Sequence, residues 1–206
     1  MGQICMATSR VLVQEGCYDK FVEQFKEVVK PTSKVGDPFA EDTFQGPQVT
    51  KAQYEKVLGY IESGKSEGAT LAAGGVLYKN MRDGKGFFIE PTIFTDVKDT
   101  MKIYRKEIFG PFVVIVSFKT EEEALAKAND TTYGLRSAVF TRDVERAHRV
   151  ANRLEAGMVW VNSSNDSDFR VPFGGVKQSG RRELGEAGLA AYSQTKAVHV
   201  NMGLKL

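Results

Sequence analysis

The sequence lacks the features that mark several common classes of protein. Its 206 residues include only 2 Cys, too few for a disulfide framework, and this points to a reducing, cytoplasmic compartment. No apolar run approaches the roughly 20 residues that span a bilayer. The 28 Lys and Arg residues are scattered and balanced by 26 Asp and Glu residues, whereas nucleic-acid binding favours a clustered basic face. We therefore expect neither a membrane nor a nucleic acid as partner.

Histidine is as scarce as cysteine. His148 and His199 are isolated and lack the spacing of metal ligands, and no His lies near Cys5 in the sequence. We therefore expect no metal site, and a Cys–His protease has no support in the sequence.

Segments typical of strands and helices alternate along a chain that is 42% hydrophobic and 26% charged. Arg10–Gln14 and Val113–Phe118 are short, apolar and rich in β-branched residues, which predicts buried strands. The apolar spacing of residues 18–29 and 54–61 predicts two helices that each turn one face to a core. This alternation predicts an α/β domain with a largely parallel central sheet flanked by helices.

Local signals predict where two helices end or begin. Pro31 should terminate the first helix, because proline cannot donate the backbone hydrogen bond that a helix interior needs. Thr50 and Gln53 match a capping box at the start of the second helix, in which each side chain bonds to the backbone N–H of the other residue.

The last ten residues, 197–206, follow a pattern of their own. Val198, Val200, Met202 and Leu204 alternate with more polar neighbours, as in a half-buried strand. A strand at a chain end needs a partner, and an exposed one favours pairing with another chain. We therefore divide the chain into a domain over residues 1–196 and a C-terminal oligomerisation strand over 197–206, and we expect a homo-oligomer.

Cys5 is the first candidate for chemistry. A thiolate is a good nucleophile, and the small residues that follow Cys5 would let backbone N–H groups approach an oxyanion. The alternative is a structural thiol, because a free cysteine commonly behaves as a small hydrophobic residue. We assign that structural role to Cys17.

Glu107 and Phe109 lie in the sequence KEIFGPF, directly before a predicted strand. A carboxylate held by a Gly-Pro turn could accept hydrogen bonds from two vicinal hydroxyls, as a ribose offers, and Phe109 would supply a flat apolar surface. The alternative is a surface glutamate beside a core phenylalanine. The residues alone leave both interpretations open.

Residues 170–185 combine a Pro-Phe-Gly-Gly turn with basic residues and further glycines. They do not match the dinucleotide-binding fingerprint, because no G-x-G-x-x-G follows a predicted strand here. Their composition allows a phosphate-binding loop, but we favour the wall of a pocket or an interface.

Seven segments, in this order, resemble the C-terminal half of the NAD(P)-dependent aldehyde dehydrogenase superfamily. They are GQIC at 2–5, GPQV at 46–49, KEIFGPF at 106–112, YGL at 133–135, GMVWVN at 157–162, PFGGVKQSG at 172–180 and ELGEAGLAAY at 183–192. Each motif is modest alone, but the ordered set is specific and covers essentially the whole chain. The resemblance implies the catalytic-domain fold of that family.

The resemblance also implies a role for each candidate residue. Cys5 would attack a small-molecule aldehyde and pass through a thiohemiacetal and a thioester to the acid, with its own backbone N–H as an oxyanion donor. Glu107 would hold the nicotinamide ribose of NAD or NADP, with Phe109 beside the nicotinamide. Gln53 matches a position near the same ribose, in competition with its capping role, and Phe173 matches a position in the aldehyde channel.

The sequence departs from the family pattern in several places. Lys106 stands where family members usually carry a second Glu, and SGRRELG at 179–185 is one residue shorter than the usual pattern. The family's cofactor domain, general-base glutamate and oxyanion-hole asparagine match nothing in these 206 residues. We therefore expect a C-terminal portion with little dehydrogenase activity on its own. A cofactor-independent thiol esterase and a non-catalytic assembly module are the alternatives.

Overall fold

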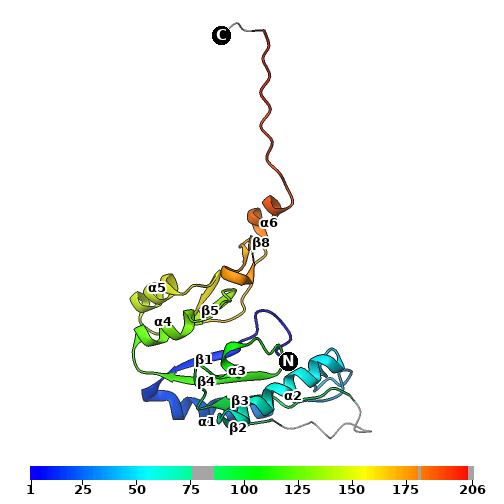
Figure 1. Cartoon of the computed structure of the whole chain (residues 1–206), viewed down its shortest axis with the longest axis vertical. Coiled ribbons are helices and arrows are strands. Elements are labelled where there is room, and N and C mark those ends of the chain that lie inside the picture. The colour runs from blue at the N-terminus through cyan, green and yellow to red at the C-terminus, as the bar shows by residue number, and fades with distance from the viewer. Residues whose placement is uncertain (76–85, 181, 204–206) are drawn as a thin grey trace. The chain divides into compact units, whose positions relative to one another are not determined.

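The structure is a computed structural model that describes residues 1–75, 86–180 and 182–203. No helix within these ranges is both long and apolar enough to cross a membrane. The chain forms two compact units, Met1–Thr131, blue to green in Figure 1, and Thr132–Leu206, yellow-green to red.

Four strands form a mixed sheet in the first unit. Their order across the sheet is β1 (Arg10–Gln14), β4 (Phe112–Phe118), β3 (Thr92–Thr95) and β2 (Thr70–Ala73). The inner strand β4 pairs in parallel with β1 and with β3, whereas β2 lies antiparallel to β3 at one edge. The two strands predicted from β-branched runs are confirmed, as is the largely parallel pairing.

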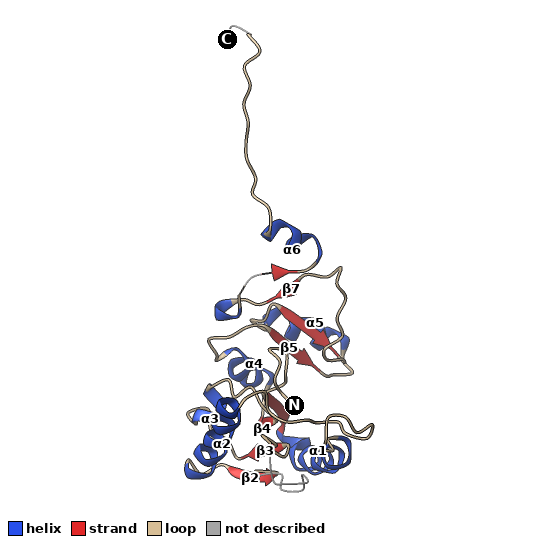
Figure 2. Cartoon of the chain, turned by 90° about the vertical axis from the view of Figure 1, so that its right-hand side faces the viewer, coloured by secondary structure: helices blue, strands red, loops and turns tan. Residues whose placement is uncertain are grey.

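Helices cover both faces of this sheet. Figure 2 shows α1 (Tyr18–Thr32) on one face, and α2 (Lys51–Ser66) and α3 (Lys102–Arg105) on the other. A 3₁₀ turn at Glu15–Cys17 joins β1 to α1, and α4 (Glu121–Asn129) follows β4. The α/β class predicted from the alternating pattern is confirmed.

The helix ends agree with the sequence signals only in part. The prediction that Pro31 terminates α1 is wrong, because the helix runs through Pro31 to Thr32. A proline in the last turn removes a single backbone bond, and the Thr32 hydroxyl donates to the carbonyl of Val28 at 2.6 Å. Thr50 caps α2 as predicted, since its hydroxyl accepts a hydrogen bond from the backbone N–H of Gln53 at 3.2 Å.

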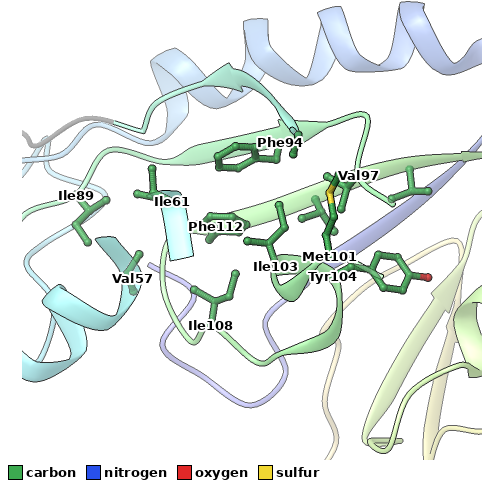
Figure 3. Close-up of a cluster of buried hydrophobic side chains, with 13 residues drawn as sticks. Val57, Ile61, Ile89, Phe94, Val97, Met101, Ile103, Tyr104, Ile108 and Phe112 are labelled. Atoms are coloured by element: carbon green, nitrogen blue, oxygen red, sulfur yellow. The ribbon is translucent and has the colours of Figure 1, made fainter. Parts of the chain in front are cut away.

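The larger core of the first unit joins α2 to the sheet. Figure 3 shows Val57 and Ile61 of α2 gathered with Phe94 of β3 and Phe112 of β4. The rings of Phe94 and Phe112 stack with their centroids 5.2 Å apart. Ile108, in the segment before β4, is buried in the same cluster. Each such side chain contributes roughly 1.5–3 kcal/mol on burial, so this cluster fixes α2 and the entry to β4 relative to each other.

The second unit contains two smaller sheets. β5 (Arg136–Val139) and β6 (Met158–Val161) pair in parallel, and α5 (Val144–Arg153) connects them in the sequence. Further along, β7 (Phe173–Gly174) pairs antiparallel with β8 (Arg182–Glu183), and α6 (Gly185–Ala191) follows. A 3₁₀ turn at Lys177–Ser179 lies between β7 and β8. The described strands are thus divided among three sheets, of which the four-stranded one is the largest.

Residues 193–203 continue after α6 without regular structure (Figure 1). Val198 and Val200 are each 70% exposed and Met202 is 85% exposed, and no strand in the described ranges pairs with this segment. The half-buried strand therefore does not form within a single chain. Its pairing with another chain and the domain limits at residues 196 and 197 stay predictions, and residues 204–206 lie outside the described ranges.

Candidate active site

Cys5 lies in a tight turn before β1. The backbone N–H of Ala7 donates to the carbonyl of Ile4 at 2.9 Å, which closes the turn around Cys5, and the Cys5 side chain is exposed. The carbonyl of Ser9 then accepts a hydrogen bond from the N–H of Val114 at 3.0 Å, where β1 joins β4. A solvent-accessible thiol is thus carried on a turn that the sheet anchors at its far end.

The segment before Cys5 is fixed by two contacts with other loops. Gly2 has a φ of +70°, and a Cβ built on it would overlap the carbonyl oxygen of Gly110. A position of this kind favours glycine, because a side chain would meet backbone that has no room to move. The side-chain oxygen of Gln3 accepts a hydrogen bond from the N–H of Val49 at 2.9 Å. These contacts bring the Cys5 turn against the loops that end at Val49 and at Gly110.

Glu107 and Phe109 lie in the loop that Gly2 touches. The Glu107 side chain is exposed, Ile108 is buried, and Phe109 is half-buried. Phe109 has a φ of +62°, a left-handed conformation that is strained for a residue with a side chain. The N–H of Phe112 donates to the carbonyl of Gly110 at 2.7 Å. Because Ile108 is buried between them, the side chains of Glu107 and Phe109 are the ones that stay at least partly accessible on this loop.

Gln53 contacts the same loop from the first turn of α2. Its side-chain Nε2 donates to the carbonyl of Ile108 at 2.9 Å and to the carbonyl of Phe109 at 2.7 Å. The predicted capping box is therefore only half formed: Thr50 caps Gln53, while the Gln53 side chain bonds across the fold. Sequence reasoning missed this contact, because Ile108 and Phe109 lie 55 and 56 positions after Gln53 in the chain.

Phe173 belongs to the second unit, where it is half-buried in β7 opposite Glu183 of β8. Cys5, Gln53, Glu107 and Phe109 all belong to the first unit. The structure thus brings four of the five predicted site residues into one compact unit and places the fifth in the other.

The glycine-rich loop of the second unit uses its basic side chains internally. Nη1 of Arg182 donates to the carbonyls of Gly174 and Gly175 at 2.6 and 3.0 Å. Nζ of Lys177 forms an ion pair with Glu155 at 2.5 Å. Charges engaged in this way shape the loop itself, which favours the pocket-wall interpretation over phosphate binding; Arg181 lies outside the described residues.

Sequence reasoning missed three residues that hold the Cys5 turn against its neighbouring loops: Gly2, Gln3 and Gly110. The glycines in GQIC and FGPF were the available signal, since a glycine often marks a close backbone approach. Their partners could not be read from local sequence. Within the described ranges, no group of three or more His, Cys, Asp or Glu side chains is arranged to hold a metal ion.

The sequence model of the aldehyde dehydrogenase family matches residues 1–198. The chain belongs to this family. The aldehyde dehydrogenase of Alternaria alternata is 53% identical over 203 residues, which make up 98% of this chain and 40% of that protein.

Solved aldehyde dehydrogenase structures share the fold. An NAD+ complex of the enzyme from Bacillus cereus has a TM-score of 0.92 and 44% identity, and the match covers 98% of this chain and 40% of that one. A betaine aldehyde dehydrogenase point mutant from Staphylococcus aureus, in complex with NAD+ and with a BME-modified cysteine, has a TM-score of 0.93 and 41% identity. That match covers 100% of this chain and 42% of the other. The chain therefore spans about two fifths of the length of these relatives, and membership of the family implies NAD or NADP as the cofactor.

Proposed function

We propose that this chain forms the catalytic part of an aldehyde dehydrogenase, which oxidises an aldehyde to a carboxylic acid with NAD or NADP. The observation that carries the proposal is the contact between Gly2 and Gly110. This contact sets an exposed thiol and an exposed carboxylate, those of Cys5 and Glu107, on two loops that touch.

Cys5 acts as the nucleophile. Its thiolate sulfur bonds to the aldehyde carbon while the carbonyl π pair moves to oxygen, which gives a thiohemiacetal alkoxide. Transfer of hydride from that carbon to the oxidised nicotinamide that the cofactor would supply leaves a thioester. Water then displaces the sulfur, which releases the acid and regenerates the thiol. The backbone N–H of Cys5 stabilises the oxyanion in both tetrahedral stages. The exposed position of the Cys5 side chain suits this role.

Glu107 and Phe109 hold the nicotinamide end of the cofactor. An exposed carboxylate can accept hydrogen bonds from both hydroxyls of a ribose, and a half-buried ring offers one apolar face to a flat heterocycle. The two side chains lie on one loop, so the residues present fit this part of the cofactor. When bound, the nicotinamide supplies the hydride acceptor.

Phe173 lines the path of the aldehyde. Phe173 is half-buried in β7, where its backbone pairs with Glu183 of β8, and the carbonyl of Gly174 accepts a hydrogen bond from Arg182. A ring carried on a strand paired in this way can restrict the width of an apolar channel, which would make Phe173 a determinant of which aldehydes enter.

The 206-residue chain alone turns over slowly as a dehydrogenase. The resemblance assigns the cofactor domain and the general base to sequence that these residues do not contain. Without the cofactor domain little holds the dinucleotide. Positioned acid–base groups typically contribute 10²–10⁴-fold to a rate, so hydrolysis of the thioester on Cys5 is slow as well.

An activated ester tests the proposal without any cofactor. With p-nitrophenyl acetate, the Cys5 thiolate attacks the ester carbonyl and expels p-nitrophenolate, which leaves an acetyl group on sulfur. We expect a single stoichiometric burst that is lost in Cys5→Ser and retained in Cys17→Ser, the matched control on the other exposed cysteine. An unchanged burst in Cys5→Ser would contradict the proposal. Continuous release would favour the thiol esterase.

Self-association through residues 197–206 is the second part of the proposal. Exposed apolar side chains alternate along this segment, and no strand of the described ranges pairs with it, so it is suited to strand addition by a second copy of the chain. A non-catalytic assembly module would use the same segment but would show no ester burst.

A further inference from the structure

The side-chain amide of Gln53 joins two successive carbonyl groups of the Glu107 loop. An amide nitrogen has two N–H donors, and Nε2 of Gln53 donates to the carbonyls of Ile108 and Phe109. Both donors are therefore committed within the protein. The side-chain oxygen of Gln53 is the atom that remains for contact with a cofactor hydroxyl.

These two carbonyls flank the one strained residue of the loop. The carbonyl of Ile108 belongs to the peptide plane before the Phe109 Cα, and the carbonyl of Phe109 belongs to the plane after it. Fixing both planes fixes φ and ψ of Phe109, whose φ is +62°. A non-glycine residue persists in this region only when its surroundings hold it there. The Gln53 amide has the position and the donors to supply that restraint.

The first turn of α2, from which the Gln53 side chain extends to the loop, is itself held by several contacts. The Thr50 hydroxyl caps the backbone N–H of Gln53, and the ring of Tyr54 packs at 5.6 Å from that of Phe87. One turn further on, Val57 is fully buried. An amide on a helix end anchored in this way holds the loop in a fixed position relative to α2.

We propose that Gln53 is a positioning residue, which holds Phe109 in its left-handed conformation and thereby aims the Glu107 carboxylate and the Phe109 ring. The inference rests on the proposed function for its consequence, since Glu107 and Phe109 matter as nicotinamide ligands. The structural part, a coupling between Gln53 and the φ of Phe109, does not depend on any ligand.

A double-mutant cycle tests this coupling on the whole 206-residue chain. Q53L should raise the unfolding equilibrium constant, measured with urea, by about tenfold, because it removes both donors from a strained loop. In the F109G background, Q53L should have a clearly smaller effect, because glycine adopts a positive φ without strain and only the loss of the two hydrogen bonds remains. Q24L, on an exposed face of α1, is the matched control and should leave the equilibrium constant unchanged.

Nuclear magnetic resonance reports the conformation directly. A positive φ brings the amide and α protons of Phe109 unusually close, which gives a strong cross-relaxation peak within that residue. This peak should be strong in the parent and in Q24L and should weaken in Q53L and in Q53E, which keeps the side-chain volume and loses both donors. Nicotinamide mononucleotide, followed through the Glu107 amide signal, should bind about tenfold more weakly to Q53L.

Each result separates the two proposals. If Q53L destabilises the F109G chain as much as the parent, or if the Phe109 peak is unchanged in Q53E, Gln53 does not position the loop. If those results are as expected but the parent chain gives no response to nicotinamide mononucleotide, the positioning role stands and the assignment of the loop to the cofactor is wrong.

Discussion

The backbone of Gly2 lies directly against the carbonyl oxygen of Gly110, with no room for a Cβ between them. Gly2 is three residues before Cys5, and Gly110 is three residues after Glu107. One backbone contact therefore fixes the separation of the loop that carries Cys5 from the loop that carries Glu107.

Gly2→Ala should disrupt this contact. A Cβ at this position overlaps a carbonyl oxygen, and the φ of +70° is strained for alanine. We expect a loss of about 2 kcal/mol or more in the free energy of unfolding, together with a slower ester burst from Cys5. Urea titration and stopped-flow absorbance measure the two effects.

Gly16→Ala is the matched control for this substitution. Gly16 has no heavy atom within 4 Å of a built Cβ, so alanine there should leave both stability and burst rate close to those of the parent. Equal effects of Gly2→Ala and Gly16→Ala would show that the Gly2 contact does not organise the site.

Glu67 should make stability depend on pH. Hydrogen bonds from the Ser63 hydroxyl and then from the backbone N–H of Lys102, at 2.7 Å, hold the pKa of Glu67 below its ordinary value. A carboxyl whose pKa is lower in the folded state contributes stability above its unfolded pKa, near 4.3, and this contribution is lost as pH falls through the folded value. The midpoint of urea unfolding should therefore drop as the pH is lowered below about 4.3.

Glu67→Gln should make that acid limb less steep, because the variant has no proton to bind at this position. The rest of the slope remains, because the pKa values of three other carboxyls are also lowered, those of Asp42, Glu123 and Asp168. Glu62→Gln is the control. Glu62 lies in α2 about one turn before Glu67 and forms an exposed ion pair with Lys65. The slope of Glu62→Gln should match that of the parent. The same slope in Glu67→Gln and the parent would remove Glu67 as the source.

Self-association should depend on one face of the C-terminal segment. A double substitution of Val198 and Val200 by Asp should reduce the mass in solution to the 22.8 kDa of one chain, because it places charges on the apolar side of the expected strand. His199→Asp, on the alternate side, should leave the assembly intact. Light scattering after size exclusion measures the mass, and an oligomer that survives deletion of residues 197–206 would exclude this segment as the contact.

The sequence predicted the parts of the fold that depend on local pattern. The apolar run of β4 and the Thr50 cap of α2 were visible because β-branched runs and caps act within a few residues. The direction of the Gln53 side chain could not be predicted. The capping-box pattern predicts a bond to the backbone N–H of Thr50, whereas the side chain bonds to the carbonyls of Ile108 and Phe109, which are distant in the sequence. Tertiary contacts decided between the two.

The site divides in the same way. Cys5 and Glu107 were found through ordered motifs that resemble a family, and spacing alone left both with ordinary structural alternatives. The contact of Gly2 with Gly110 brings the loops of Cys5 and Glu107 together, and neither motif contains a signal that points to the other.

Protection of Cys5 by nicotinamide mononucleotide tests most directly whether Cys5 and Glu107 form one site. Iodoacetamide alkylation of each cysteine is followed by mass spectrometry of the intact chain and its peptides. Rising concentrations of the nucleotide should slow alkylation of Cys5 in a saturable manner and leave Cys17 unchanged, and Glu107→Gln should abolish the protection while Glu122→Gln keeps it. Equal rates at Cys5 with and without the nucleotide, or equal slowing at Cys5 and Cys17, would contradict a shared site.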